Sequence, residues 1–140
     1  KELWNHHKMV KRTMFNYDGV EGGKTGYTTK AGGTLVTFAK RGDQELIVVD
    51  LCAHGYELYE DTIKMLNYGF NNYKTIAPFK TMNTVLKDDT YGFLKTGNEL
   101  SQYKIPLKQK QSASKLTYKC KDNKYIISYD GKQIGSVKLY

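Results

Sequence analysis

The segment formed by residues 20–28 has the pattern of a β-strand but contains glycine at three positions, Gly22, Gly23 and Gly26. A glycine weakens a strand interior because its backbone loses more freedom on ordering and it contributes no side chain to pack. Glycines are favoured in strands where a ligand or another backbone must approach closely. The segment therefore predicts a strand that forms the wall of a binding site, with Lys24 and Thr25 between the glycines.

The residues after this strand predict a hairpin and then a helix. Residues 34–39 alternate as in a strand, and Arg41-Gly42-Asp43 has the composition of a tight turn. Residues 45–51 form a nearly continuous apolar run, which suits a strand covered on both faces. From residue 56 to residue 73 the apolar period becomes helical. The predicted apolar face of the helix contains Leu58, Ile63, Leu66 and Phe70, with Tyr59 and Met65 beside it.

The pattern changes at Pro78, which predicts a domain boundary. Beyond it, short alternating segments are separated by turn residues. The segments are residues 84–86, 91–94, 105–107, 115–120, 125–129 and 133–139. This cadence is typical of a small antiparallel sandwich or barrel. We therefore expect an α+β chain with two domains, residues 1–76 and residues 77–140.

The positive charge is concentrated in the second of these segments. Residues 77–140 contain twelve lysines and five acidic residues, a balance of +7, whereas residues 1–76 have a balance of +1. Such a segment is either a solvated face or a surface drawn to lipid headgroups or cell-wall polymers. Nucleic-acid binding is disfavoured, because no arginine follows Arg41 and no known module is present. No apolar run is long enough for a transmembrane helix.

The cysteines and histidines carry little functional signal. Cys52 and Cys120 fall in different segments, and their spacing favours two separate structural thiols, although a disulfide stays open. The histidines are His6, His7 and His54, and they form no metal-ligand pattern with the cysteines. We expect neither a metal nor a cofactor.

The flanks of Lys24-Thr25-Gly26 make this short motif specific. Residues 19–36 follow the pattern G-[VI]-x-G-x-K-T-G-[YH]-T-x-x-A-G-x-x-L-V. In this respect the chain resembles D-alanyl-D-alanine carboxypeptidases of the penicillin-binding protein 5 type, in which Lys-Thr-Gly is the third active-site signature. Three further runs agree in order, residues 5–10, 46–49 and 65–70. The resemblance is strong over residues 1–76, which would be the end of a transpeptidase-like catalytic domain. It implies a β-rich second domain over residues 77–140.

The resemblance also implies roles for individual residues. Lys24 would place a cation beside the catalytic serine and its proton-transfer partners. Thr25 would donate a hydrogen bond to the terminal carboxylate of the substrate, and Gly26 would let the substrate lie along the strand. The backbone N–H of Tyr27 would be one donor of the oxyanion hole. His6 aligns with a family position that often holds an arginine for the same carboxylate. Outside the resemblance, Lys24 reads as an ordinary strand lysine, and His6 and His7 as solvent-facing or structural side chains.

The nucleophile that such an enzyme needs is not among the serines of this chain. They are Ser101, Ser112, Ser114, Ser128 and Ser136. Ser112 has a lysine three residues later, but both lie in a polar stretch. We therefore expect a Ser-x-x-Lys motif upstream, in a serine-bearing half from which this chain, starting at Lys1, is cut. Without that half, bare apolar surface and a strand edge would cause self-association or domain swapping.

Three functions remain open from the sequence. The first is part of a serine-type carboxypeptidase that works outside the cytoplasm, in the cell envelope, with peptidoglycan stem peptides and β-lactams as partners. The second is a non-catalytic cell-wall-binding module, with contact to a peripheral membrane or cell-wall surface. The third is a related β-lactamase, against which the second β domain argues.

Overall fold

The computed structural model describes residues 6–10, 13–79, 100, 102–122 and 124–138. The chain divides into two compact units, Lys1–Tyr73 and Lys74–Tyr140. The predicted strands over residues 84–86 and 91–94 lie outside the described residues. Antiparallel sheets and a single long helix make up the described part, so the predicted α+β class is confirmed.

The first unit is built on an antiparallel sheet of three strands. These are β1 (Val20–Thr28), β2 (Gly32–Arg41) and β3 (Gln44–Ala53), in the order β1-β2-β3. The bounds of β1 agree with the prediction. The turn between β2 and β3 contains Gly42 with φ +58°, a conformation that glycine adopts without a steric penalty.

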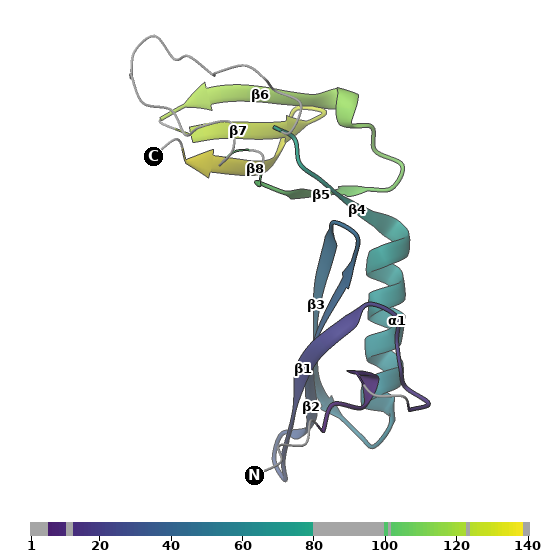
Figure 1. The fold of residues 1–140 in the computed structure, drawn as a ribbon. Coiled ribbons are helices and arrows are strands. Elements are labelled where there is room, and N and C mark those ends of the chain that lie inside the picture. Colours follow the sequence, from purple (N-terminus) through teal and green to yellow (C-terminus); the bar gives the residue numbers. More distant parts are fainter. Residues whose placement is uncertain (1–5, 11–12, 80–99, 101, 123, 139–140) are drawn as a thin grey trace. The chain divides into compact units, whose positions relative to one another are not determined.

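Helix α1 (Glu57–Asn72) packs against one face of this sheet, as Figure 1 shows. Of the predicted apolar face, Leu58, Leu66 and Phe70 are buried, and Ile63 is partly buried. From the sheet, the core receives Leu35, Ala39 and Val48, which alternate with outward residues as a pleated strand requires.

The opposite face of the sheet is apolar and exposed in the described structure. Its side chains have exposed fractions of 42% for Val36, 70% for Ile47, 52% for Val49 and 67% for Leu51. We call these four residues the open face. The prediction that the strand over residues 45–51 is covered on both faces is wrong for the described residues, because α1 covers one face alone. An apolar run does not reveal which partner covers each side.

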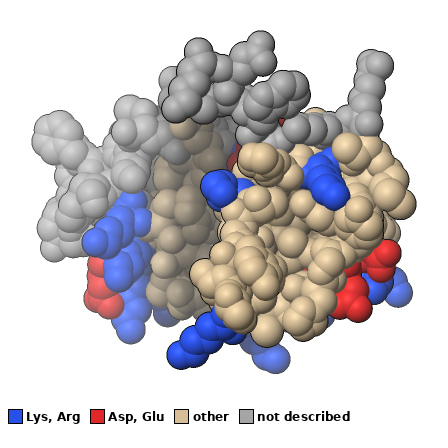
Figure 2. All heavy atoms as spheres, turned by 90° about the horizontal axis from the view of Figure 1, so that it is seen from below, with Lys and Arg blue, Asp and Glu red and all other residues tan. Residues whose placement is uncertain are grey.

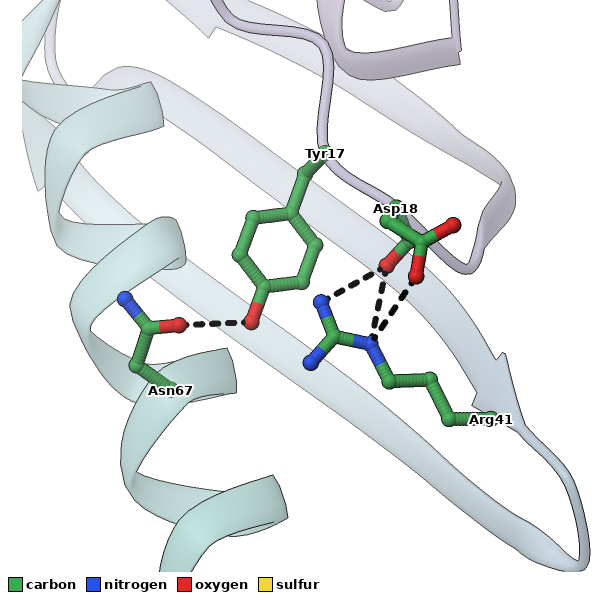
Figure 3. Close-up of polar contacts among 4 residues, drawn as sticks. All are labelled: Tyr17, Asp18, Arg41 and Asn67. Carbon is green, nitrogen blue, oxygen red and sulfur yellow. Dashed lines mark hydrogen bonds and ion pairs between the residues drawn. The ribbon is translucent and has the colours of Figure 1, made fainter.

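The connection that leads into β1 is fastened to the sheet and to α1 (Figure 3). Tyr17 donates a hydrogen bond from its hydroxyl to Asn67 Oδ1 over 2.8 Å. Arg41 at the end of β2 donates to the main-chain oxygen of Asp18. The short helix η1 (Lys8–Val10) precedes this connection and buries Met9 in the core. These contacts fix where β1 begins.

The second unit contains two small sheets. Strand β4 (Tyr73–Ile76) pairs with β5 (Ile105–Lys108), and β6 (Leu116–Lys121), β7 (Lys124–Tyr129) and β8 (Lys132–Lys138) form an antiparallel sheet. The short helix η2 (Ala113–Lys115) leads into β6. The core of the unit contains Phe79, Leu100, Ile105, Leu107, Leu116, Tyr125 and Ile127. The sequence did not predict β4, because it follows α1 directly with no turn residue between them.

The surface bears scattered charge, and on the face drawn in Figure 2 charged side chains lie around broad uncharged areas. Cys52 and Cys120 are both free and exposed. None of the helices in the described part of the chain is long and apolar enough to cross a membrane. Among the described residues, no three His, Cys, Asp or Glu side chains gather as a metal site.

Candidate functional site

Strand β1, which carries the Lys-Thr-Gly motif, lies at the edge of its sheet. In the order β1-β2-β3 it pairs with β2 on one side, and within the described residues no strand pairs with its other side. The N–H and C=O groups on that side are arranged as a strand would need to add a further extended chain. The motif is thus presented on an edge to which a peptide can be added.

Lys24 points away from α1, toward the open face. It stands opposite Val36, which in turn stands opposite Val49. Residues directly opposite in an antiparallel pair lie on the same face, and Val36 and Val49 are exposed. The Lys24 ammonium is exposed and donates a hydrogen bond to the Thr25 main-chain oxygen over 2.6 Å. Its charge is therefore held close to the motif itself.

The two neighbours of Gly26 lie on the other face of the strand. Thr25 stands opposite the buried Leu35 and is half-buried, so its side chain turns toward the α1 side. Tyr27 stands opposite Gly33, and 76% of its surface is exposed, since no large side chain lies across from it. The motif therefore exposes its lysine and half-buries its threonine.

Two glycines of β1 stand where a side chain would collide with a neighbour. A methyl carbon added to Gly26 would lie 2.5 Å from Thr34 Oγ1. One added to Gly23 would press on the Val36 carbonyl oxygen and lie 2.5 Å from His7 Nε2. The same test at Gly22 meets nothing within 4 Å. At Gly23 and Gly26, the groups that approach the strand closely are therefore other residues of this chain.

His7 is the residue at this site that sequence reasoning did not single out. It is 1% exposed, its Nε2 lies 2.9 Å from Thr37 Oγ1, and its ring meets the Tyr59 ring edge-on at 6.4 Å. Burial lowers the pKa of His7, and hydrogen bonding with the backbone of Val36 acts in the opposite direction. The sequence signal that could have found it is the spacing of His7 and Met9, which are both buried.

His6, the histidine assigned to the substrate from the sequence, is exposed. It is adjacent in the chain to His7, which packs against the strand at Gly23. The four motif residues Lys24, Thr25, Gly26 and Tyr27 come together on β1, whereas His6 lies on the segment before η1.

Asp50 is a second titratable group with an altered environment. It stands opposite Leu35 on the α1 side of β3, and its Oδ2 is buried. Burial raises the pKa of the Asp50 carboxyl, and the nearby Asp61 on α1 raises it further. Asp50 thus lies on the face away from Lys24.

Comparison with known proteins gives relatives of one kind. The chain is 36% identical over 90 residues to the D-alanyl-D-alanine carboxypeptidase DacF of Bacillus subtilis, a match that covers 62% of this chain and 22% of the relative. It is 35% identical over 77 residues to the D-alanyl-D-alanine carboxypeptidase DacC of Escherichia coli, which covers 54% of this chain and 18% of the relative. This chain is similar to a part of each of these carboxypeptidases. The resemblance predicted from the Lys-Thr-Gly strand is confirmed.

Solved structures of such carboxypeptidases have the same fold. Penicillin-binding protein 6B from Escherichia coli matches with a TM-score of 0.59 and 21% identity, over 98% of this chain and 38% of its own. Penicillin-binding protein 5 from Haemophilus influenzae matches with a TM-score of 0.56 and 21% identity, over 86% of this chain and 40% of its own. No family model matches the chain. The chain spans about a fifth of the length of the curated carboxypeptidases that it matches, at 22% and 18%.

Proposed function

We propose that this chain is the part of a serine-type D-alanyl-D-alanine carboxypeptidase that holds the substrate against the Lys-Thr-Gly strand. The observation that carries the proposal is the edge of β1 that pairs with no other strand of the described part of the chain, on the strand that bears Lys24, Thr25 and Gly26. An extended stem peptide of peptidoglycan would pair with that edge through main-chain hydrogen bonds. A β-lactam would occupy the same place. The enzyme would work outside the cytoplasm, at the cell envelope.

Lys24 and the open face support a place for the serine-bearing half. Exposed apolar surface of this kind is costly in water and is typical of a surface that another segment covers. Because Lys24 lies on the same face, a segment that covered Val36, Ile47, Val49 and Leu51 would come next to the ammonium group. The nucleophilic serine would then lie where Lys24 can favour its deprotonated form. This arrangement would divide the active site between the two parts.

The chemistry of the proposed enzyme follows in two steps. The serine oxygen attacks the carbonyl carbon between the two D-alanines, the C–N bond breaks, and D-alanine leaves with a proton on its nitrogen. Water then attacks the carbonyl carbon of the ester: its hydroxyl becomes part of the new carboxyl group of the shortened peptide, and its other hydrogen restores the serine hydroxyl. The main-chain N–H of Tyr27 would donate to the oxyanion in both steps, and the loss of one such donor typically costs about 10²–10³ in rate. Thr25 and His6 would bind the terminal carboxylate.

The test is acylation by a fluorescent penicillin in a protein that contains this chain together with the Ser-x-x-Lys segment. Intact mass before and after incubation reports the covalent adduct, and its rate of formation is compared between Lys24→Ala and Lys30→Ala. Lys30 is exposed and lies two residues beyond the end of β1, so it is a matched control. We expect Lys24→Ala to slow acylation at least about a hundredfold and Lys30→Ala to leave it unchanged. Equal rates in the two variants, or no adduct in the unaltered protein, would overturn the proposal.

A second candidate function is a non-catalytic cell-wall-binding module, and a feature of the second unit favours it. In the sheet β6-β7-β8, Lys121 stands opposite Lys124, and Lys124 stands opposite Lys138. All three side chains are exposed. We call them the lysine row. Like charges directly opposite in a sheet are destabilising, and an anionic partner would remove that repulsion.

The lysine row makes this candidate testable without the serine. The chain is sedimented with insoluble peptidoglycan at low and high salt, because attraction between exposed charges is screened by salt. Replacement of the row by glutamine is compared with replacement of Lys104, Lys108 and Lys110, which removes the same charge from exposed positions elsewhere in the unit. The module predicts that only the first set loses binding, whereas equal losses would indicate nonspecific attraction to net charge.

A further inference from the structure

The buried imidazole of His7 lies directly under the strand that carries the Lys-Thr-Gly motif. Its Nε2 is within 2.9 Å of Thr37 Oγ1, and Thr37 stands opposite Gly23 in the β1–β2 ladder. His7 and Thr37 are 30 residues apart in the chain and are 1% and 0% exposed. The contact therefore joins the segment before η1 to the centre of the sheet. It does so at the level of Gly23, the residue that precedes Lys24.

The fit of the ring under β1 is close. A methyl carbon on Gly23 would lie 2.5 Å from His7 Nε2 and 2.6 Å from its Cδ2. The ring thus occupies the space that a side chain at position 23 would fill on the α1 side of the strand. It also makes a T-shaped contact with the Tyr59 ring of α1, at an interplanar angle of 82°. The ring is wedged between β1 and α1, so its position and the position of this part of β1 depend on each other.

We propose that His7 is a positioning residue for the Lys-Thr-Gly strand: the neutral imidazole supports β1 at Gly23 and, through Thr37, holds it in register with β2. Its catalytic meaning rests on the proposed carboxypeptidase function, since Lys24, Thr25 and Gly26 follow directly on the supported residue. His7 acts through the strand and does not touch the substrate. This role belongs to the buried His7, whereas the sequence predicted a functional role for the exposed His6.

The surroundings of His7 favour its neutral form. Burial lowers the pKa of the His7 imidazole because the charged form loses its hydration. The groups that face it are Gly23 of β1, the Thr37 side chain and Val36 backbone of β2, and the phenol-bearing Tyr59 of α1. The Lys8 ammonium lies 6.0 Å from the centre of the same Tyr59 ring, and like charges repel each other. Acid therefore places a charge in a space that fits a neutral ring.

The test is residue-resolved amide hydrogen exchange, measured by NMR on the full 140-residue chain and corrected for the intrinsic pH dependence of exchange. The amides of β1 that bond β2 are compared with those between β2 and β3. Three variants are used: His7→Ala removes the support, His7→Gln keeps a hydrogen-bonding amide of similar reach that cannot titrate, and His6→Ala is the exposed neighbour. In the unaltered chain the same amides are followed as the pH is lowered from neutral, together with the His7 ring carbons.

We expect His7→Ala to accelerate exchange of the β1 amides at least about tenfold more than exchange of the β2–β3 amides, with His7→Gln restoring most of the protection and His6→Ala changing nothing. In the unaltered chain the β1 amides should lose protection at the pH at which the His7 ring titrates, a measurement that needs no variant to fold. Uniform acceleration across the sheet, or β1 amides that ignore the titration, would refute the positioning role. The exchange experiment does not depend on the catalytic serine. If penicillin acylation fails while this exchange pattern is observed, the proposed function is refuted and the positioning role of His7 is not.

Discussion

Arg41 donates two hydrogen bonds to the main-chain oxygen of Asp18, from Nε over 3.1 Å and from Nη2 over 3.0 Å (Figure 3). The same guanidinium lies over the Tyr17 ring at 4.7 Å and over the Phe70 ring at 4.5 Å. One side chain thus joins the connection before β1, the end of β2 and the last turns of α1. The start of the motif strand is fixed by this contact and not by the Asp18 carboxylate, whose Oδ2 lies 3.6 Å from Nε and is almost fully exposed.

The first prediction separates the main-chain contact from the ion pair. Arg41→Ala should lower the free energy of unfolding by about 1–3 kcal/mol, because it removes two charge-assisted hydrogen bonds and the contact with two rings. Asp18→Asn should lower it by less than about 0.5 kcal/mol, because an exposed ion pair contributes little and the main-chain oxygen remains. Urea denaturation followed by circular dichroism measures both. Equal losses would show that the carboxylate, and not the carbonyl oxygen, holds Arg41.

The second prediction concerns two adjacent glycines of β1. Gly23→Ala should destabilise the chain by about 1–3 kcal/mol or more, because the new methyl group would collide with the Val36 carbonyl oxygen and the His7 ring. Gly22→Ala should be neutral or should stabilise by about 0.4–1 kcal/mol, since nothing lies within 4 Å and the unfolded chain loses freedom. Thermal denaturation of the two single variants decides between them. A tolerated alanine at position 23 would show that His7 does not support the strand tightly.

The two glycines also show which features of the fold can be predicted from local sequence patterns and which cannot. The strand pattern of residues 20–28, the helical period after residue 56 and the flanks of Lys24 are local signals, and the sheet, α1 and the relatives agree with them. Gly22 and Gly23 are alike in sequence, and what distinguishes them is His7, sixteen residues before Gly23. That contact depends on tertiary packing, which a local sequence pattern does not predict.

The open face and β4 were missed for related reasons. The apolar run over residues 45–51 gives the strand but not what covers it, and alternate residues Ile47, Val49 and Leu51 remain exposed. Strand β4 is only four residues long and follows α1 without a break, so its pairing with β5, about thirty residues later in the chain, has no local signature. The roles of Lys24, Thr25, Gly26, Tyr27 and His6 stay predictions that the acylation experiment addresses.

The third prediction is a loss of stability in mild acid. A histidine whose pKa is lowered in the folded state binds its proton more readily in the unfolded chain, so the free energy of unfolding is greatest above the ordinary histidine pKa of about 6.5. It should fall as the pH drops below that value, by at most about 1.4 kcal/mol per pH unit, until the lowered pKa of His7 is reached. Urea denaturation at several pH values between 7.5 and 5.5 measures the slope.

The variant His7→Gln provides the control for this slope, because its side chain does not titrate. The slope should flatten in His7→Gln and persist in His6→Gln, where the exposed histidine is removed. Asp50 acts in the opposite direction nearer the range of carboxyl groups, because its pKa is raised and its protonated form is favoured by folding. The measurement therefore stays above that range. A slope that is the same in all three proteins would assign the acid sensitivity to groups other than His7.

The fourth prediction is self-association of the 140-residue chain through the open face. The exposed fractions of Ile47 and Leu51, 70% and 67%, leave apolar surface of β3 in water, on the face of the sheet toward which Lys24 points. Pairing of such surfaces between two copies releases water and stabilises a dimer or larger species.

The variant Ile47→Lys should disrupt this pairing, because a buried lysine without a partner is costly. Ile134→Lys is the control, since Ile134 is an exposed isoleucine, at 37%, on β8 of the other unit. Sedimentation velocity over a range of concentrations should give a larger species for the unaltered chain and for Ile134→Lys, and a monomer for Ile47→Lys. A monomer in all three at high concentration would mean that the open face does not drive association of the chain.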